Sequence, residues 1–308
     1  MEKLSKTYTT GIFNQKQFKA LDEVSFTIEC GETLGLIGES GCGKSTLART
    51  LLGLTPPSSG KVFFKGKELS FSGRQELKDI RGKMQIIFQH PESALNPRMK
   101  IIDCLMEPMR IQKLSPKRGE ERKRVCELLE KVELGEEHLN RYPHQLSGGQ
   151  IQRVVLARIL SLNPEFIVAD EPTSMLDVSV QAQVLHILKE IQVQYHNAYL
   201  FVSHDLDLVY WMSDRVAVMY KGQIVEIGPA EEVCKKPQHP YSLLLVKAFN
   251  SFQQNTVETS LIGSTSEDSL TLGCSYAPLC PKVCSICKQQ KPELREIAEA
   301  HYIACWQE

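Results

Sequence analysis

The chain has 308 residues, of which 42% are hydrophobic and 24% are charged, so it is long enough to bury a substantial core. Its 36 basic and 37 acidic side chains nearly cancel and form no basic stripe, which argues against a nucleic-acid binder. No apolar run reaches the roughly 18 residues of a membrane helix, and no signal peptide is recognised. We therefore expect a cytosolic chain, for which any membrane role would require a partner chain.

Strands and helices alternate in the first half of the chain. The short apolar run 33–38 predicts a buried strand, and leucines at helical spacing predict a helix over 44–54. Strands are expected over 61–65 and 84–89. Residues 99–162 are expected to be mostly helical, which indicates a helical insertion.

The second half returns to the same alternation. An apolar strand is expected over 166–169, a long amphipathic helix over 178–196 and another strand over 199–203. The segment 215–227 alternates about a Lys221-Gly222 turn, which predicts a hairpin. Strands that alternate with helices imply an α/β core with a parallel sheet.

A glycine-rich run, Gly38-Glu-Ser-Gly-Cys-Gly-Lys-Ser-Thr46, lies between a predicted strand and a predicted helix and matches the phosphate-loop pattern. Its glycines let backbone N–H groups point at phosphate oxygens, and the helix N-terminus adds positive potential. Lys44 is expected to reach the β- and γ-phosphates, and the Ser45 hydroxyl is expected to bind Mg²⁺. The residues expected to contact nucleotide are Gly38, Ser40, Gly41, Gly43, Lys44, Ser45 and Thr46.

Two acidic residues, Asp170 and Glu171, follow the apolar run 166–169. A carboxylate at the end of a strand beside a phosphate loop can hold Mg²⁺ through water, which is the role expected for Asp170. Glu171 is placed to orient or deprotonate the attacking water. An acidic pair after a strand is weak evidence alone, but it becomes strong when a phosphate loop precedes it in the chain.

A second anion site is predicted at Leu146-Ser-Gly-Gly-Gln150, where a hydroxyl and close-approaching N–H groups lie at a helix start. One chain has little use for two phosphate cradles, whereas two chains packed head to tail can each close the other's ATP site. The run resembles the LSGGQ signature of the ABC ATPase family. The residues that this resemblance assigns to the partner's nucleotide are Ser147, Gly148, Gly149 and Gln150.

The resemblance extends over roughly residues 1–230 and assigns further roles. Gln89 resembles the Q-loop glutamine, which serves Mg²⁺ and catalysis. Ser174-Met-Leu-Asp177 resembles the D-loop, with Met where Ala is usual, and Asp177 is expected near nucleotide. His204 resembles the switch histidine that contacts the γ-phosphate. The family implies a P-loop NTPase cassette, RecA-like, with an antiparallel β subdomain and an inserted α-helical signature subdomain.

An aromatic residue near the N-terminus stacks on adenine in this family. Tyr8 lies in the corresponding position, and Phe13 and Phe18 are the alternatives. The chain carries one cassette, with too few residues between Gly43 and Leu146 for the coiled-coil arm of a DNA-repair member. A translation factor of the family would usually carry two cassettes. A transporter subunit is therefore expected, and a soluble regulatory ABC ATPase without a membrane partner is the alternative.

Three further runs are similar to the peptide/nickel importer family: FQHPESALNPR at 88–98, VSVQAQ at 178–183 and QHPY at 238–241. The resemblance implies ATP- and Mg²⁺-dependent import of oligopeptides, dipeptides or nickel, with other small solutes as alternatives. The implied partners are two membrane-spanning permease subunits, a second ATPase chain that is related or identical and, indirectly, an extracytoplasmic solute-binding protein. No nucleic acid is implied. The chain is expected as a peripheral protein on the cytoplasmic face of the membrane.

We expect a cassette over residues 1–229, with its helical subdomain at about 95–163, and an extension over 230–308 with a polar linker at about 250–272. The extension ends in a Cys-rich tail that matches the importer family. The matching cysteines imply a [4Fe–4S] cluster in some members, and zinc or free thiols are the alternatives. The four matching cysteines are Cys274, Cys280, Cys287 and Cys305. This chain departs from the family pattern at Leu279, where Arg is usual, and in the additional Cys284.

Overall fold

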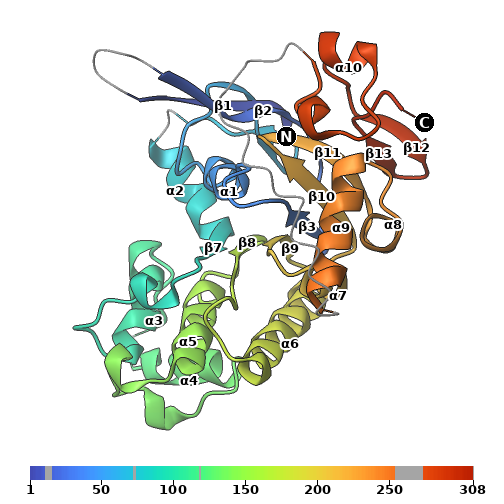
Figure 1. The fold of residues 1–308 in the computed structure, drawn as a ribbon. Coiled ribbons are helices and arrows are strands. Elements are labelled where there is room, and N and C mark those ends of the chain that lie inside the picture. Colours follow the sequence, from blue (N-terminus) through green and yellow to red (C-terminus); the bar gives the residue numbers. More distant parts are fainter. Residues whose placement is uncertain (11–15, 72–73, 118, 254–272, 308) are drawn as a thin grey trace.

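The computed structural model of the chain describes residues 1–10, 16–71, 74–117, 119–253 and 273–307. A mixed eight-stranded sheet lies at its centre. Figure 1 shows the hairpin of β1 and β2 on one side of this sheet, the helices α3, α4 and α5 as a lobe at the opposite end, and the C-terminal segment beside β11.

The main sheet has the strand order β12-β13-β11-β10-β3-β9-β8-β7. Strands β10, β3, β9, β8 and β7 run parallel, whereas β11, β13 and β12 are added antiparallel to their neighbours. The bounds of the strands are β3 (Thr33–Ile37), β7 (Met84–Ile87), β8 (Phe166–Asp170), β9 (Ala198–Val202), β10 (Arg215–Tyr220), β11 (Gln223–Pro229), β12 (Arg295–Ala298) and β13 (His301–Ile303).

Two small antiparallel sheets complete the β structure of the described ranges. One has the order β2-β1-β4 and the other pairs β5 with β6. Their strands are β1 (Glu2–Thr10), β2 (Lys16–Val24), β4 (Ser59–Lys61), β5 (Phe63–Phe64) and β6 (Lys67–Glu68). The sheet of β1, β2 and β4 is the antiparallel unit that the ABC resemblance implied.

Helices follow most of the parallel strands, as the alternating pattern predicted. Their bounds are α1 (Lys44–Leu51), α2 (Arg74–Lys83), α3 (Ile101–Ile111), α4 (Glu121–Glu130), α5 (Gly148–Leu160), α6 (Val178–Tyr195), α7 (Leu206–Met212), α8 (Ala230–Lys235), α9 (Pro240–Gln253) and α10 (Ser285–Gln289). Helices α3, α4 and α5 fall within the stretch 99–162, which confirms that this stretch is mostly helical.

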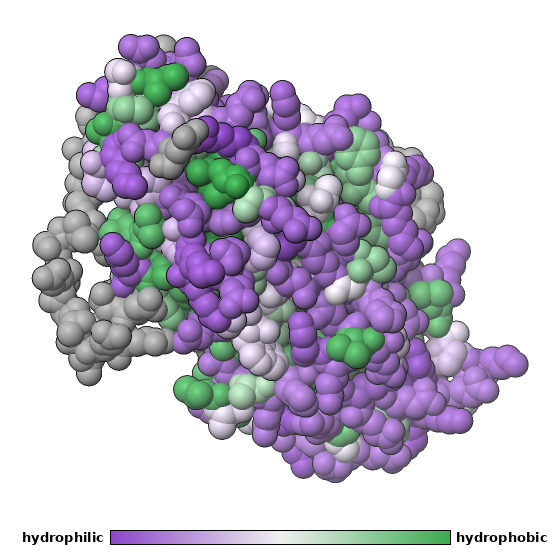
Figure 2. All heavy atoms as spheres, turned by 90° about the vertical axis from the view of Figure 1, so that its right-hand side faces the viewer, coloured by the Kyte–Doolittle hydropathy of each residue, from purple (hydrophilic) through white to green (hydrophobic). Residues whose placement is uncertain are grey.

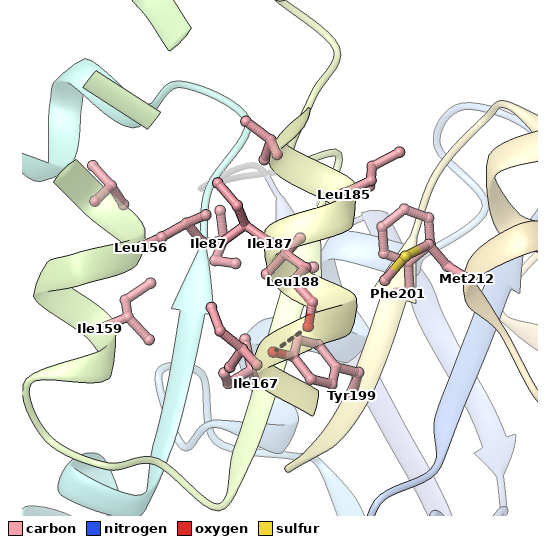
Figure 3. Packing of buried hydrophobic residues seen from close by; sticks show 14 of the residues in the cluster. Ile87, Leu156, Ile159, Ile167, Leu185, Ile187, Leu188, Tyr199, Phe201 and Met212 are labelled. Carbon is pink, nitrogen blue, oxygen red and sulfur yellow. Dashed lines mark hydrogen bonds between the residues drawn. The ribbon is translucent and has the colours of Figure 1, made fainter. Parts of the chain in front are cut away.

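Apolar side chains from the parallel strands pack against helices α5 and α6 to form one part of the core (Figure 3). The strands contribute Ile87, Ile167 and Phe201, each at most 2% exposed. Burial of such side chains supplies most of the free energy that holds the helices on the sheet. The hydroxyl of Tyr199, also drawn in Figure 3, donates to the carbonyl of Leu188 at 3.4 Å, so it is not left unpaired.

The structure differs from the predicted elements at several boundaries. Helix α1 stops at Leu51 rather than residue 54, and Gly53 follows with a φ of 65°. The strand predicted over 61–65 is divided between β4, which pairs with β1, and β5, which pairs with β6. Helix α9 runs to Gln253, so it covers the start of the predicted linker. The rest of that linker lies outside the described residues.

The described helices include none that is both long and apolar enough to cross a membrane. The face shown in Figure 2 is mostly hydrophilic, with apolar residues in separate patches.

Candidate nucleotide site

The phosphate loop joins the buried strand β3 to helix α1, and three of its glycines have left-handed backbone conformations. The φ values of Gly38, Gly41 and Gly43 are 151°, 80° and 114°. A β-carbon on Gly38 would lie 2.2 Å from the Met219 carbonyl oxygen, and one on Gly43 would lie 2.4 Å from the Ala20 carbonyl oxygen. Glycine is therefore required at both positions by conformation and by close packing.

Lys44 lies across its own loop. Its side-chain ammonium donates to the carbonyl of Gly38 at 2.7 Å and to the carbonyl of Glu39 at 2.9 Å, and the residue is only 9% exposed. These neutral acceptors hold the Lys44 ammonium at the place where it is expected to contact phosphate oxygens. A phosphate can compete for this ammonium because charge-assisted hydrogen bonds are stronger than bonds to carbonyl groups.

Asp170 ends strand β8 and lies beside the phosphate loop. The Ser45 hydroxyl lies close enough to its carboxylate to stabilise the charged form. Burial raises the pKa of Asp170, as does the neighbouring charge of Glu171, whereas Ser45, Arg49 and Lys44 act in the opposite direction. Ser45 and Asp170, two of the three residues predicted to bind Mg²⁺, are thus neighbours, and their hydroxyl and carboxylate are the oxygen ligands that Mg²⁺ prefers.

Three predicted catalytic residues meet at the carboxyl ends of β7, β8 and β9. The Gln89 side-chain amide donates to Glu171 Oε2 at 2.8 Å, and His204 Nδ1 lies 3.3 Å from Glu171 Oε1. Glu171 itself has a φ of 49°, and its N–H donates to the Val202 carbonyl at 2.9 Å.

A cavity of about 200 Å³ opens beside this group. Glu171 and His204 line it together with residues to which the sequence had assigned no individual role. Among these, the Gln181 side-chain amide donates to the Thr173 hydroxyl at 3.0 Å and joins the start of α6 to the loop after β8. The lining residues are Glu171, Thr173, Ser174, Leu176, Gln181, Ser203, His204, Asp205 and Leu208.

The signature run begins helix α5 with a reciprocal cap. The Ser147 hydroxyl accepts from the Gln150 N–H at 3.3 Å, and the Gln150 side-chain oxygen accepts from the Ser147 N–H at 3.0 Å. Gly149 packs on helix α6, since a β-carbon there would lie 2.3 Å from Val180 Cγ1. Asp177 caps α6 by accepting from the Val180 N–H at 3.0 Å, and the Ser179 hydroxyl and this N–H lower the pKa of Asp177.

The adenine candidates lie on the β1–β2 hairpin. Tyr8 is 37% exposed and faces Phe18, which is 53% exposed, across the two strands. The Lys6 ammonium lies 5.2 Å from the centre of the Tyr8 ring. Phe13 lies outside the described residues. An exposed aromatic ring is therefore present where the resemblance predicts stacking on a base.

The cysteines of the tail are brought into one region, but they do not form a recognisable metal site. Cys284 Sγ and Cys287 Sγ are 3.1 Å apart, and the Cys274 N–H donates to the Cys287 carbonyl at 2.8 Å. Burial raises the pKa of Cys274 and Cys280, and neighbouring thiols, including that of Cys305, add to this effect. Across the described ranges, no group of three or more His, Cys, Asp or Glu side chains is arranged to hold a metal ion. The geometry therefore gives the iron–sulfur prediction no support.

Comparison with known proteins identifies families and relatives with similar sequences. Residues 21–174 match the ABC transporter family, and residues 225–287 match the family described as oligopeptide/dipeptide transporter, C-terminal region. The oligopeptide transport ATP-binding protein AppF of Bacillus subtilis is 41% identical over 96% of this chain and 92% of its own length. The di/tripeptide transport ATP-binding protein DppF of Pseudomonas aeruginosa is 41% identical over 96% of this chain and 92% of its own length.

A solved structure shows the same fold. The dimeric post-hydrolysis state of the ATP-binding cassette MJ0796, bound to ADP and Pi, superposes with a TM-score of 0.67 at 31% identity, covering 74% of this chain and 97% of that one. The cassette fold predicted from the motifs is thereby confirmed. The chain belongs to the ABC transporter ATP-binding proteins, a family of ATPases, and carries the C-terminal region of their oligopeptide/dipeptide branch.

Proposed function

We propose that the chain is the ATP-binding and ATP-hydrolysing subunit of an ABC importer for oligopeptides or dipeptides. The observation that carries the proposal is the placement of Glu171 between Gln89 and His204, next to the contact of Asp170 with Ser45. The names of the relatives and the matched C-terminal region support peptides as the substrate class.

In this proposal each group has a defined task. The ammonium of Lys44 leaves the carbonyls of its loop for the β- and γ-phosphates, and the loop N–H groups surround them. Ser45, Gln89 and Asp170 hold Mg²⁺, which neutralises phosphate charge when it is bound. Glu171 orients the attacking water and accepts its proton.

The remaining contacts of the nucleotide follow from the same proposal. His204 donates to the γ-phosphate oxygens where charge develops, and Tyr8 stacks on adenine. Asp177 lies at the edge of the site. The other nucleotide-binding residues are the glycines and hydroxyls of the phosphate loop, Gly38, Ser40, Gly41, Gly43 and Thr46.

The signature acts on a second cassette. Ser147, Gly148, Gly149 and Gln150 present a capped helix start that suits the γ-phosphate of ATP bound to the partner chain. Met175 and Val178 are 61% and 81% exposed next to Asp177, which supports burial of this surface against another chain. The dimeric state of the similar cassette MJ0796 agrees with this arrangement. The partner is a related ATPase chain or a second copy.

The cassette is assigned to residues 1–229, with the signature subdomain at about 95–163, and the importer-type extension to 230–308. Two permease subunits dock against the segment 89–98, which places the chain peripherally at the cytoplasmic face of the membrane. The solute-binding protein acts through the permeases. The cysteines of the tail are assigned a structural or regulatory role, and iron and sulfide analysis after anaerobic purification decides whether they hold a cluster.

Peptide uptake by the complete transporter tests this function. Vesicles containing the chain, its companion ATPase and the permeases are supplied with binding protein and labelled peptide. ATP-dependent uptake is expected with the wild-type chain. Lys44→Ala should weaken ATP binding about tenfold or more, because it removes charge-assisted hydrogen bonds to phosphate, and should abolish uptake. Uptake of Ni²⁺ but not peptide would reassign the substrate, and failure to co-purify with any permease would favour the regulatory ATPase.

A further inference from the structure

Both backbone groups of Glu39, the second residue of the phosphate loop, are held by side chains. Its N–H donates to the hydroxyl of Tyr241 at 3.1 Å, and its carbonyl accepts from the Lys44 ammonium at 2.9 Å. Tyr241 lies on helix α9, 202 residues further along the chain and outside the predicted cassette. A residue of the C-terminal extension is therefore in direct contact with the loop that is expected to bind phosphate.

The ring of Tyr241 is fixed by two other tyrosines. It is 1% exposed and lies 4.5 Å from the ring of Tyr220, at the end of β10, and 5.5 Å from the ring of Tyr276, in the C-terminal tail. Tyr220 and Tyr276 also meet edge to face, at 5.3 Å and 87°. Such tilted aromatic pairs are favourable in addition to the area that they bury. The phenol is consequently held in one orientation by the cassette and by the tail together.

The backbone before Tyr241 is fixed by a buried carboxylate. Glu226 of β11 is 0% exposed and accepts from the N–H groups of Gln238 and His239, both at 2.9 Å. His301 of β13 contacts the same carboxylate at 2.8 Å. His239 then accepts from the Tyr241 N–H through Nδ1 at 3.1 Å. The start of α9 is thus connected to two strands of the main sheet.

We propose that Tyr241 is a positioning residue for ATP binding, through which the C-terminal extension holds the phosphate loop in its binding conformation. The proposal rests on the proposed function. When Lys44 turns to the phosphates, the Glu39 carbonyl loses its ammonium donor, whereas the bond from the Glu39 N–H to Tyr241 can persist. This bond keeps the peptide plane between Gly38 and Glu39 in place, so the start of the loop need not reorganise as nucleotide enters.

The test compares Tyr241→Phe with Tyr199→Phe. Both variants remove one hydroxyl from a tyrosine at most 1% exposed, but the Tyr199 hydroxyl bonds to Leu188 in the core beneath the sheet (Figure 3). Titration with MgATP and MgADP under non-turnover conditions should show affinity about fivefold weaker for Tyr241→Phe. Tyr199→Phe should change the affinity less than about twofold, even if its melting temperature falls as far as that of Tyr241→Phe. Equal affinities for the two variants would overturn the proposal.

Hydrogen exchange at the Glu39 amide gives a second measurement that does not depend on ATP. The amide should be protected in the nucleotide-free wild-type protein and should exchange about fivefold faster in Tyr241→Phe, with no change in Tyr199→Phe. An unprotected Glu39 amide in the wild-type protein would contradict the proposal. If the wild-type chain failed to bind MgATP while this protection was present, the proposed function would fail and the contact would stand.

Discussion

His239 is a residue whose charge the fold determines. It is 1% exposed, and burial lowers its pKa to about 4. Its Nδ1 accepts a hydrogen bond from the Tyr241 N–H, which requires that nitrogen to be unprotonated. In the unfolded chain the pKa is about 6.5, so the unfolded state binds more protons between these two pH values. The stabilising effect of neutral His239 is complete above pH ~6.5 and is lost as the pH falls towards ~4.

Stability should therefore fall in mild acid through this residue. Between pH ~7.5 and pH ~5, the free energy of unfolding should decrease by about 2 kcal/mol because of His239. His239→Asn retains an acceptor oxygen but has no titrating group, so it should remove this part of the decrease. Urea unfolding of both proteins at both pH values measures the difference. An equal decrease in the free energy of unfolding of both proteins would show that folding does not lower the pKa of His239.

At the scale of elements, the signature helix α5 depends on its close approach to α6. A β-carbon on Gly149 would lie 2.3 Å from Val180 Cγ1, whereas one on Gly148 would lie 3.7 Å from Leu176 Cδ2, an ordinary contact. Valine in a helix has essentially one side-chain rotamer, so Val180 cannot easily move aside. The glycine at position 149 is therefore required by packing, in addition to its proposed role at the partner's nucleotide.

This difference gives a matched pair of variants. Gly149→Ala should lower the free energy of unfolding by about 1–2 kcal/mol, because overpacking outweighs the better helix propensity of alanine. Gly148→Ala should be neutral or slightly stabilising. Denaturant unfolding without nucleotide separates this effect from ligand binding. A Gly149→Ala protein as stable as Gly148→Ala would mean that α5 and α6 are further apart than described.

The central elements were predictable because their sequences are short and apolar or have helical periodicity. Strands β3, β8 and β9 and helix α6 lie within a residue or two of the predicted spans. Helix α2 was not predicted, because its sequence RQELKDIRGK is mostly charged and has little periodic apolar pattern. Strand β12 has only exposed side chains, so no alternation of apolar and polar residues marks it.

The individual residues of the site could be predicted from the sequence, but the contacts between them could not. The order of the motifs identified Gln89, Glu171 and His204, yet their contact depends on β7, β8 and β9 being neighbours, which motif order alone does not fix. The bond from Glu39 to Tyr241 could not be foreseen, since it joins residues 202 positions apart. From the sequence alone, the run QHPY at 238–241, which ends in Tyr241, was only recognised as similar to the importer family.

At the scale of the whole molecule, the C-terminal segment continues the main sheet of the cassette. Strand β13 pairs with β11, and β12 pairs with β13. The contact between His301 and Glu226 is buried at this junction, where both residues are at most 3% exposed. The extension and the nucleotide-binding part therefore share a sheet, a buried carboxylate and the tyrosine cluster of Tyr220, Tyr241 and Tyr276.

We propose that Glu171 activates water for the hydrolysis of ATP bound at the phosphate loop. The most direct measurement is MgATP binding and hydrolysis by the assembled transporter carrying Glu171→Gln in this chain. The amide keeps the shape of the side chain and one acceptor oxygen, but it cannot accept the proton. Hydrolysis at this site should fall at least about a hundredfold, while the dissociation constant for MgATP changes less than about threefold. Hydrolysis at the wild-type rate would show that Glu171 does not activate the water.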